Sequence, residues 1–212
     1  MNTIKSIIFD LGNVIFNISY EKAIENFRKL EIKDAHNFYS QKQQHPIFDK
    51  LETGKIDTKQ FVTEIQAMSH CSKEEILTAW NSMLLDLPEE RIVLIKQLQK
   101  KYNLFLLSNT NEIHIKKIKD ILGKEKYLNF IKLFNKIYYS HEVGLRKPDP
   151  EIFKLVLNEN KLEKNEVLFI DDSIQHINSA LNIGIHAFHL KKENNIIEEF
   201  SGTSQLKHHL YL

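Results

Sequence analysis

Residues 4–17 read IKSIIFDLGNVIFN, an apolar run that reaches an aspartate, Asp10, and then a Gly-Asn turn. A continuously apolar run of this kind is typical of a strand that is buried on both faces of a parallel sheet. Ligands of open α/β sheets bind outside the carboxyl ends of the strands. Asp10 therefore stands where a functional group is expected, and it is our candidate nucleophile.

Three later segments repeat this pattern of an apolar strand followed by a polar group. The strand NLFLLSN ends in Ser108, and the strand VLFIDD ends in Asp171 and Asp172. A weaker strand over residues 136–140 leads into a loop that carries Lys147. An anion, a hydroxyl, a cation and an acid pair would thus meet at one edge of one sheet. These are the groups that a magnesium-assisted phosphoryl transfer requires.

The rest of the second half alternates predicted helices with these strands. Helices are expected over residues 91–100, 112–122, 127–134, 150–158 and 174–181, and a last short strand over residues 185–190. Gly123 follows the second of these helices and suits its C-cap. The alternation predicts an α/β fold with a doubly wound, Rossmann-like parallel sheet and right-handed crossovers.

Residues 18–87 have a different character, because their apolar residues recur at helical spacing and none of their apolar runs resembles a buried strand. We therefore expect a core formed by residues 1–17 and 88–212, with a helical cap of residues 18–87 inserted after the first strand. The insertion begins just beyond Asp10. A lid hinged at this point can close over the site and exclude water.

Two stretches of the insertion carry local signals. Asp57 with Gln60 three residues later forms a capping-box pattern at a helix start. The polar-aromatic stretch of residues 43–48, which includes His45 and Phe48, has two interpretations. It either faces the site, or it is a helix end with a core aromatic.

The bulk composition excludes several classes of function. Lys plus Arg number 29 and Asp plus Glu number 28, which leaves a net charge of +1 and no basic surface for nucleic acid. The apolar runs fall short of the ~20 residues that span a bilayer, and no secretory signal precedes the first strand. Cys71 is the single cysteine, so an intrachain disulfide cannot form. We expect a cytoplasmic protein without nucleic-acid or membrane partners, and the oligomeric state stays open.

The four polar positions stand in order in FDLGNVI, LLSNTN, GLRKPDP and FIDDS. Together they resemble the motifs of the haloacid dehalogenase superfamily of hydrolases, most of which are phosphatases. The resemblance extends from Ile4 to about Leu190 and is closest to the bacterial sugar-phosphate phosphatase branch, which includes glucose-1-phosphate phosphatases. It implies a Rossmann-like core, a helical cap that sets substrate choice, bound Mg²⁺, and an aspartyl-phosphate formed on Asp10.

The resemblance also implies a metal site. Mg²⁺ would be bound by Asp10, by the backbone carbonyl of Gly12 and by Asp172. Asp171 would act through a water or a neighbouring lysine. His176 stands where many relatives carry a second acid of the fourth motif, and as a lone helix histidine it is expected at the surface.

The remaining roles concern the phosphoryl group of a small phosphorylated substrate. Lys147 would bridge nucleophile and phosphate, which makes it catalytic and substrate-binding. Ser108 and Asn109 can donate hydrogen bonds to the phosphoryl oxygens, together with backbone N–H groups of the following helix start. Arg146, beside Lys147, is expected to point to solvent.

Gly12 departs from the pattern of most phosphatases of this family, which carry Asp-x-Asp and use the second aspartate as general acid and base. Such help is typically worth roughly 10² to 10⁴ in rate. Glycine transfers no proton, although the sugar-phosphate phosphatase branch has the same Asp-Leu-Gly motif. We therefore expect a preference for good leaving groups, such as anomeric sugar phosphates or aryl phosphates.

The sequence thus predicts a magnesium-dependent phosphatase of a small phosphorylated metabolite, with a sugar phosphate as the favoured class. A 2-haloacid dehalogenase is one alternative, but it would leave the pair Asp171 and Asp172 without a purpose. The second alternative is a non-catalytic phosphometabolite-binding protein, which the glycine at position 12 favours.

Overall fold

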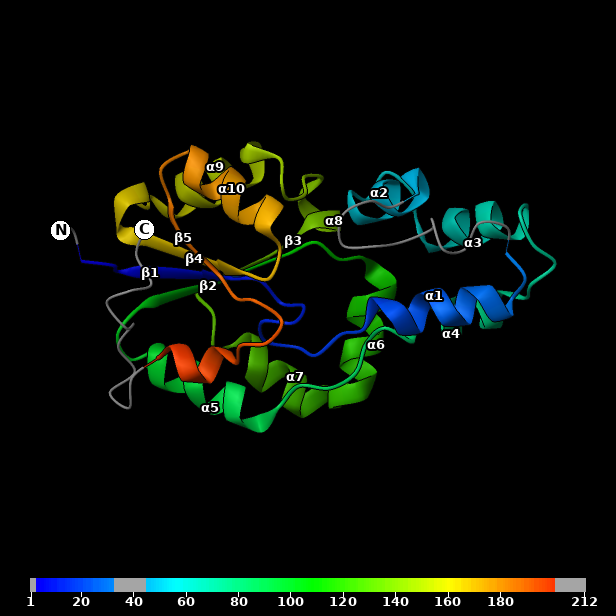
Figure 1. The fold of residues 1–212 in the computed structure, drawn as a ribbon, viewed down its shortest axis with the longest axis horizontal. Helices are drawn as coiled ribbons and strands as arrows, with labels where there is room; N and C mark the ends of the chain where they lie inside the picture. Colours follow the sequence, from blue (N-terminus) through cyan, green and yellow to red (C-terminus); the bar gives the residue numbers. More distant parts are fainter. Residues whose placement is uncertain (1–2, 33–44, 201–212) are drawn as a thin grey trace.

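The computed structural model describes residues 3–32 and 45–200, and the strands of this part form a parallel sheet in the order β3-β2-β1-β4-β5 (Figure 1). The strands are β1 (Ser6–Phe9), β2 (Asn103–Ser108), β3 (Lys136–Tyr139), β4 (Val167–Asp171) and β5 (His186–His189). Ile8 of β1 pairs in register with Phe105 of β2 and with Phe169 of β4. Because the chain fills the sheet on one side of β1 and then on the other, the switch point lies at the carboxyl end of β1.

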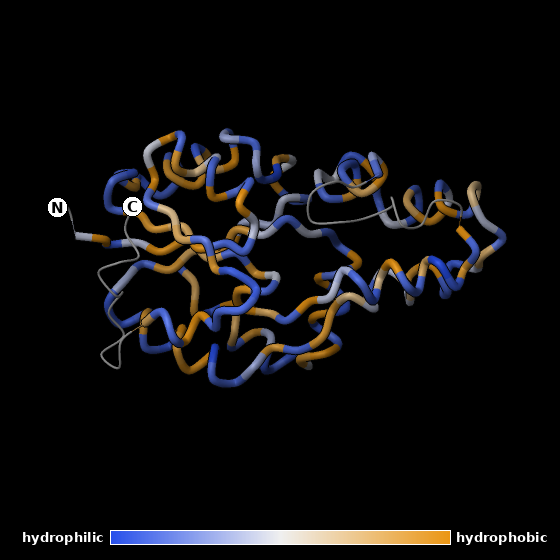
Figure 2. Tube along the Cα trace, in the orientation of Figure 1, coloured by the Kyte–Doolittle hydropathy of each residue, from blue (hydrophilic) through white to orange (hydrophobic). Residues whose placement is uncertain are grey.

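Helices cover both faces of the sheet (Figure 1). They are α5 (Glu89–Leu98), α6 (Glu112–Leu122) and α7 (Lys124–Ile131) with the 3₁₀ turn η3 (Ile196–Glu199) on one face, and α9 (Pro150–Asn160) and α10 (Ile174–Asn182) on the other. Each face of the sheet has its own hydrophobic cluster. Ile7 and Phe9 pack into the cluster on the face of α5, α6 and α7, whereas Ile8 packs into the cluster on the face of α9 and α10. β1 is therefore buried on both faces, as its apolar sequence predicts, and Figure 2 shows orange, hydrophobic stretches in the interior of this part of the chain.

The helices between β1 and α5 form a further hydrophobic cluster, which Ile113 of α6 joins. They are α1 (Tyr20–Lys29), α2 (Pro46–Glu52), α3 (Thr58–Gln66) and α4 (Lys73–Asn81), and they extend to one side of the sheet in Figure 1. Trp80 is fully buried at the centre of this cluster, with its ring 4.6 Å from that of Phe48 and 6.3 Å from those of Phe27 and Phe61. This part of the chain is helical, as predicted.

The structure decides between the two interpretations of the stretch that includes His45 and Phe48, and it tests the predicted capping box. Asp57 and Gln60 form the predicted capping box at the start of α3. Phe48 is a core aromatic, and His45 caps α2 by accepting from the backbone N–H of Ile47. The helix-end interpretation is therefore right for both residues, while Gln43 and Gln44 of the same stretch lie outside the described residues.

The first strand ends where predicted, since β1 ends at Phe9 directly before Asp10, and Val14, Ile15 and Phe16 are buried in the loop that follows. Some other predicted boundaries were wrong. The helix α7 begins at Lys124 rather than at residue 127. A short helix, α8 (Ser140–Val143), follows β3 and was not predicted. By contrast, α6 has the predicted bounds and ends at Gly123, whose φ is +74°. Among the described residues, every helix is too short or too polar to cross a membrane.

Candidate active site

The carboxyl ends of the parallel strands bring the predicted residues to one edge of the sheet. Asp10 directly follows β1 and donates its backbone N–H to the carbonyl of Ile170 in β4, at 2.9 Å. Asp171 ends β4 and Ser108 ends β2, and both side chains are buried. One carboxylate oxygen each from Asp10, Asp171 and Asp172 lies within 4.8 Å of the others.

Lys147 is fully buried and its ammonium lies between two of these carboxylates. Nζ donates to Oδ1 of Asp10 at 2.5 Å, to Oδ2 of Asp171 at 2.7 Å and to the carbonyl of Leu107 at 2.9 Å. An ammonium has three hydrogens, so these contacts use its full donor capacity. Burial alone would lower the pKa of Lys147, but the two carboxylates outweigh burial and raise it.

The side chain of Asn109 holds the backbone of Lys147. Its Nδ2 donates to the carbonyl of Lys147 at 2.8 Å, and its Oδ1 accepts from the N–H of Lys147 at 2.9 Å. The sequence predicted a contact of Asn109 with phosphate, and the structure gives its amide this second, positioning task. Ser108 and Asn109 both line the pocket that Asp10 also lines.

Asp171 has further partners that fix its ionisation. His176 donates from Nδ1 to Oδ1 at 2.9 Å, and the N–H of Ser173 donates to the same oxygen at 2.8 Å. Burial would raise the pKa of Asp171, but the charge of Lys147 and the hydrogen bond from His176 prevail and hold it well below its ordinary value. The expectation that His176 is a surface residue was wrong, since its side chain is only 17% exposed and contacts the site.

Asp172 is fixed from two sides. Asn13 donates from Nδ2 to Oδ2 of Asp172 at 2.9 Å, and His189 donates from Nε2 to the carbonyl of Asp172 at 3.0 Å. Asn13 adopts a left-handed backbone conformation with φ of +58°, which asparagine tolerates better than most residues. Its own Oδ1 accepts from the N–H of Ile18 at 3.3 Å, so the Gly-Asn turn is tied both to the site and to the start of the cap.

The charges of this cluster fit a divalent cation. Burial raises the pKa of Asp10 to about 6, against the opposing charge of Lys147, and Asp171 adds to the increase. Burial, with the charges of Asp10 and Asp171, also raises the pKa of Asp172 to about 7. Three clustered carboxylates beside one lysine therefore carry more negative charge than the protein itself offsets. Hard oxygen donors at this spacing are the ligands that Mg²⁺ prefers.

Gly12 lies in the same pocket, close to Asp10. A Cβ added at this position would lie 3.8 Å from Oδ2 of Asp10 and only 2.8 Å from Cδ1 of Ile18. The space in which a side chain at position 12 would begin is thus occupied by the terminal methyl group of Ile18. An acid at position 12 would fit only if that flexible methyl group moved.

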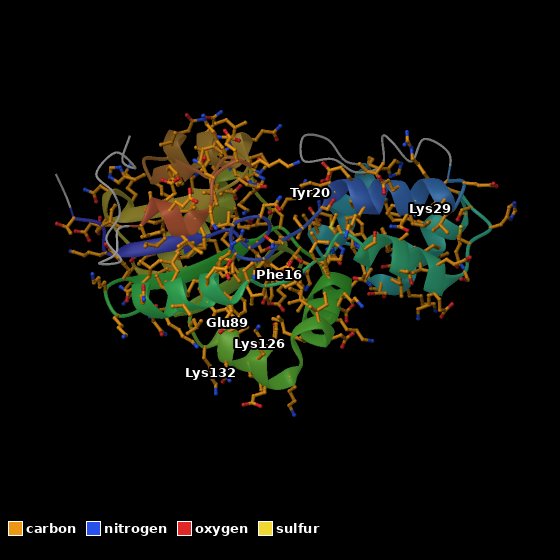
Figure 3. The ribbon with its side chains drawn as sticks, turned by 60° about the horizontal axis from the view of Figure 1, so that its bottom comes forward. Phe16, Tyr20, Lys29, Glu89, Lys126 and Lys132 are labelled. Atoms are coloured by element: carbon orange, nitrogen blue, oxygen red, sulfur yellow. The ribbon has the colours of Figure 1, made fainter. Side chains whose placement is uncertain are left out.

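The pocket extends from the strand ends to the cap and includes Tyr20, Glu52 and Arg146. It encloses about 80 Å³. In Figure 3, Phe16 lies on the segment that leads from the sheet to α1, and Tyr20 lies at the start of that helix. Arg146 does not point to solvent as expected. It contacts Asp49, and its Nη2 lies 3.0 Å from Oε2 of Glu52 in the cap helix α2.

The cap and the core also meet at His114 on α6. Its ring stacks on Trp80 of α4 with centroids 4.4 Å apart, and its Nε2 donates to the carbonyl of Trp80 at 3.2 Å. Nδ1 then accepts from the side-chain amide of Asn111 at 3.3 Å. Burial lowers the pKa of His114 to about 3, against that hydrogen bond to Trp80, so this histidine is neutral at physiological pH.

Known proteins resemble this chain in sequence and in fold. A model of the haloacid dehalogenase-like hydrolases matches residues 4–184. The D-ribitol-5-phosphate phosphatase of Bacteroides thetaiotaomicron is 31% identical over 189 residues, which cover 87% of this chain and 91% of that protein.

Solved structures show the same similarity. A HAD family enzyme from the same organism, crystallised in complex with magnesium and inorganic phosphate, superposes with a TM-score of 0.80 at 33% identity, covering 93% of this chain and 100% of that one. The L-2-haloacid dehalogenase of Xanthobacter autotrophicus superposes with a TM-score of 0.61 at 14% identity, covering 95% of this chain and 80% of that one, which shows a common fold alone.

Proposed function

Because the chain belongs to the haloacid dehalogenase-like hydrolases, we propose that it is a magnesium-dependent phosphatase of a small phosphorylated sugar or sugar alcohol. The observation that supports this most is the contact of Lys147 with both Asp10 and Asp171 beside a third carboxylate, Asp172. A nucleophilic carboxylate can approach a phosphate dianion only where positive charge offsets the repulsion. This arrangement provides one cation and the ligands for a second.

We assign the nucleophile to Asp10. One carboxylate oxygen attacks phosphorus, the ester P–O bond breaks, the leaving oxygen departs with the bonding electrons and takes a proton from solvent water, and an aspartyl-phosphate forms on Asp10. Water then attacks the same phosphorus, which releases phosphate and restores the carboxylate. Lys147 stabilises the charge on Asp10 and on the phosphoryl oxygens, and Ser108 and Asn109 bind those oxygens.

The metal would be held by Asp10, Asp172 and the carbonyl of Gly12. When bound, Mg²⁺ supplies positive charge to the phosphoryl oxygens and orients them for in-line attack. The carboxylate of Asp171 accepts hydrogen bonds from Lys147, His176 and Ser173. Because these bonds use its oxygens, Asp171 acts on the metal site indirectly. Its task is to keep the lysine charged and in place.

Residues 18–87 act in this proposal as a cap that covers the pocket and excludes water during phosphoryl transfer. Support comes from the hydrophobic cluster that α1 to α4 form with Ile113 of α6, and from the pocket lining, to which this segment contributes Tyr20 and Glu52. The leaving group would therefore lie against the cap, and the phosphoryl group against the strand ends.

The substrate class rests on the relatives. The D-ribitol-5-phosphate phosphatase covers most of this chain at 31% identity, and we extend its class of substrate, a phosphorylated sugar alcohol, to this protein. A dehalogenase is disfavoured, because a metal-free reaction leaves the carboxylate cluster unexplained. A non-catalytic phosphometabolite-binding protein is the remaining alternative, and Gly12 is the residue in its favour.

A hydrolysis assay separates these functions. Phosphate release is measured from D-ribitol 5-phosphate, glucose 1-phosphate and p-nitrophenyl phosphate, with Mg²⁺ and with EDTA. We expect turnover that requires Mg²⁺ and that is lost in Asp10→Asn. If no ester in a broad panel is hydrolysed while the phosphates still bind, the protein is a binder and not an enzyme.

A further inference from the structure

Two connections join the cap to the core, and they pair with each other. The N–H of Asn17 donates to the carbonyl of Asp86 at 2.8 Å. The N–H of Ser19 donates to the carbonyl of Met83, also at 2.8 Å. On this side of the pocket, the cap helix α4 lies beside α6 of the core (Figure 1). Because the two connections are tied together, they can act as one hinge for the cap.

On the other side of the pocket, the cap contacts the core through Arg146. The cap helix α2 lies there beside α8 of the core (Figure 1). Nη2 of Arg146 donates to Oε2 of Glu52 at 3.0 Å, and Nη1 contacts Asp49. These two acids stand three residues apart in α2 and so share one face of the helix. One guanidinium of the core therefore holds two acids of the cap.

The contact with Glu52 differs from other ion pairs between cap and core in its burial. The side chain of Glu52 is only 2% exposed, whereas that of Asp49 is 47% exposed. Removing the cation from a buried pair leaves an uncompensated charge that destabilises the arrangement strongly. Lys192 and Glu21 also join core and cap, but they lie 3.7 Å apart with side chains that are 94% and 66% exposed, so this pair contributes little. The position of the cap therefore depends more on the pair of Glu52 with Arg146.

The backbone of Arg146 is held by the core and not by the cap. Its carbonyl accepts from the N–H of Asp149 at 3.0 Å. The side chain of Asn109 bonds to both the N–H and the carbonyl of the next residue, Lys147. The guanidinium thus extends from a backbone that is fixed beside the catalytic lysine, and α2 meets this fixed group when the cap is closed.

We propose that Arg146 is a positioning residue that latches the cap closed over the pocket by binding Glu52. The closed cap excludes water from the phosphoryl group at Asp10, and release of Glu52 opens the pocket for exchange of ester and product. The purpose of the latch rests on the proposed phosphatase function, but its closure can be measured without turnover. Without Arg146, Glu52 is left uncompensated in the closed cap and regains water when the cap opens, so the open position is favoured.

The test measures the distance between two spin labels, one on the cap and one on the core, by double electron–electron resonance. The labels are attached at Lys59→Cys on α3 and Gln175→Cys on α10, which are exposed positions, in a Cys71→Ser background that removes the single native cysteine. We expect one short distance in this background and a shift of most of the distribution to a longer distance in Arg146→Met. Arg28→Met, which removes a cation at an exposed position on α1, is the matched control and should leave the distance unchanged.

The double variant Arg146→Met/Glu52→Gln separates a latch from a direct contact with phosphate, since Arg146 also lines the pocket. Without the charge of Glu52, closure is no longer penalised, so the short distance should return in part. Binding of inorganic phosphate in the presence of Mg²⁺, measured by calorimetry, should follow the cap. It should be about tenfold weaker in Arg146→Met and partly restored in the double variant, because apparent affinity scales with the closed fraction.

An unchanged distance in Arg146→Met would overturn the latch, and so would phosphate binding that is lost equally in the single and the double variant. If no ester is hydrolysed but Arg146→Met lengthens the distance and the double variant reverses the change, the latch stands and the phosphatase proposal fails. If esters are hydrolysed but the distance stays the same, only the latch fails. Circular dichroism identifies a variant that does not fold, and Arg146→Lys then decides, with a smaller shift expected in the same direction.

Discussion

Nζ of Lys147 lies 2.7 Å from Oδ2 of Asp171, and both side chains are fully buried. The same ammonium reaches Asp10 at 2.5 Å, so two buried acids share one buried cation. Burying a charge without a partner is costly, and removing one member of a buried pair typically destabilises a protein by several kcal/mol. The lysine is therefore expected to stabilise the fold when no metal is bound.

Lys147→Met should destabilise the metal-free protein by about 3 to 5 kcal/mol at neutral pH, because Asp10 and Asp171 lose their counter-charge. Urea unfolding in EDTA measures the free energy of unfolding. The double variant Lys147→Met/Asp171→Asn should recover part of the loss, since it removes one orphaned charge, yet it should remain inactive. Equal stability of Lys147→Met and wild type would contradict the paired-charge account.

Asp172→Asn should weaken Mg²⁺ binding by about tenfold or more, because a neutral amide replaces a charged ligand. Calorimetric titration with Mg²⁺ alone gives the affinity, and chelation of Mg²⁺ by EDTA should abolish turnover in wild type. Asp120→Asn provides the control, since it makes the same change at an exposed position on α6. An unchanged affinity in Asp172→Asn would remove this residue from the metal site.

His114 should make stability depend on pH. Its pKa in the folded protein is lowered to about 3 from 6.5, so the unfolded chain takes up a proton as the pH falls through 6.5 while the folded protein does not. The stabilising contribution is present above pH 6.5 and is lost as the pH falls toward 3. Between pH 7 and pH 5, wild type should lose about 2 kcal/mol more than His114→Gln.

The comparison with His114→Gln is needed because Asp10 and Asp172 act with the opposite sign. Their raised pKa values mean that their contribution is lost as the pH increases toward 6 and 7. Glutamine keeps an amide donor for the carbonyl of Trp80 but does not titrate. Parallel pH profiles of the two proteins would show that His114 is not the buried neutral group that the structure indicates.

Turnover should depend steeply on the leaving group, because Gly12 offers no proton to the departing oxygen. We expect kcat/KM to rise across phosphate esters as the pKa of the leaving alcohol falls. The double variant Gly12→Asp/Ile18→Ala places an acid at position 12 and removes the methyl group that fills its space, so it should flatten this dependence. A flat profile in wild type, with chemistry rate-limiting, would mean that another group already donates the proton.

The core of the fold and the residues at strand ends could be predicted from the sequence for one physical reason. A parallel strand that is buried on both faces is apolar throughout, so the first polar residue after it marks the edge of the sheet. This holds for Asp10, Ser108 and Asp171. Val14 to Phe16 show the limit of this reasoning, because burial in a loop gives the same apolar pattern as burial in a strand.

Residues outside the strand ends were harder to predict. Whether Arg146 turns to solvent or to the cap depends on where Asp49 and Glu52 lie, and the sequence places these two acids nearly 100 positions away without indicating the contact. His176 stands five residues after Asp171, in the first turn of α10, a position that favours contact with the acid at the preceding strand end. That spacing is a signal that could have identified it.

The central claim is that Asp10 attacks phosphorus, and trapping the covalent intermediate tests it most directly. Enzyme turning over D-ribitol 5-phosphate with Mg²⁺ is quenched in acid, digested, and analysed by mass spectrometry. We predict one phosphate on the peptide that contains Asp10, which disappears with EDTA and in Asp10→Asn. A phosphate on another residue, or full turnover by Asp10→Asn, would contradict the account.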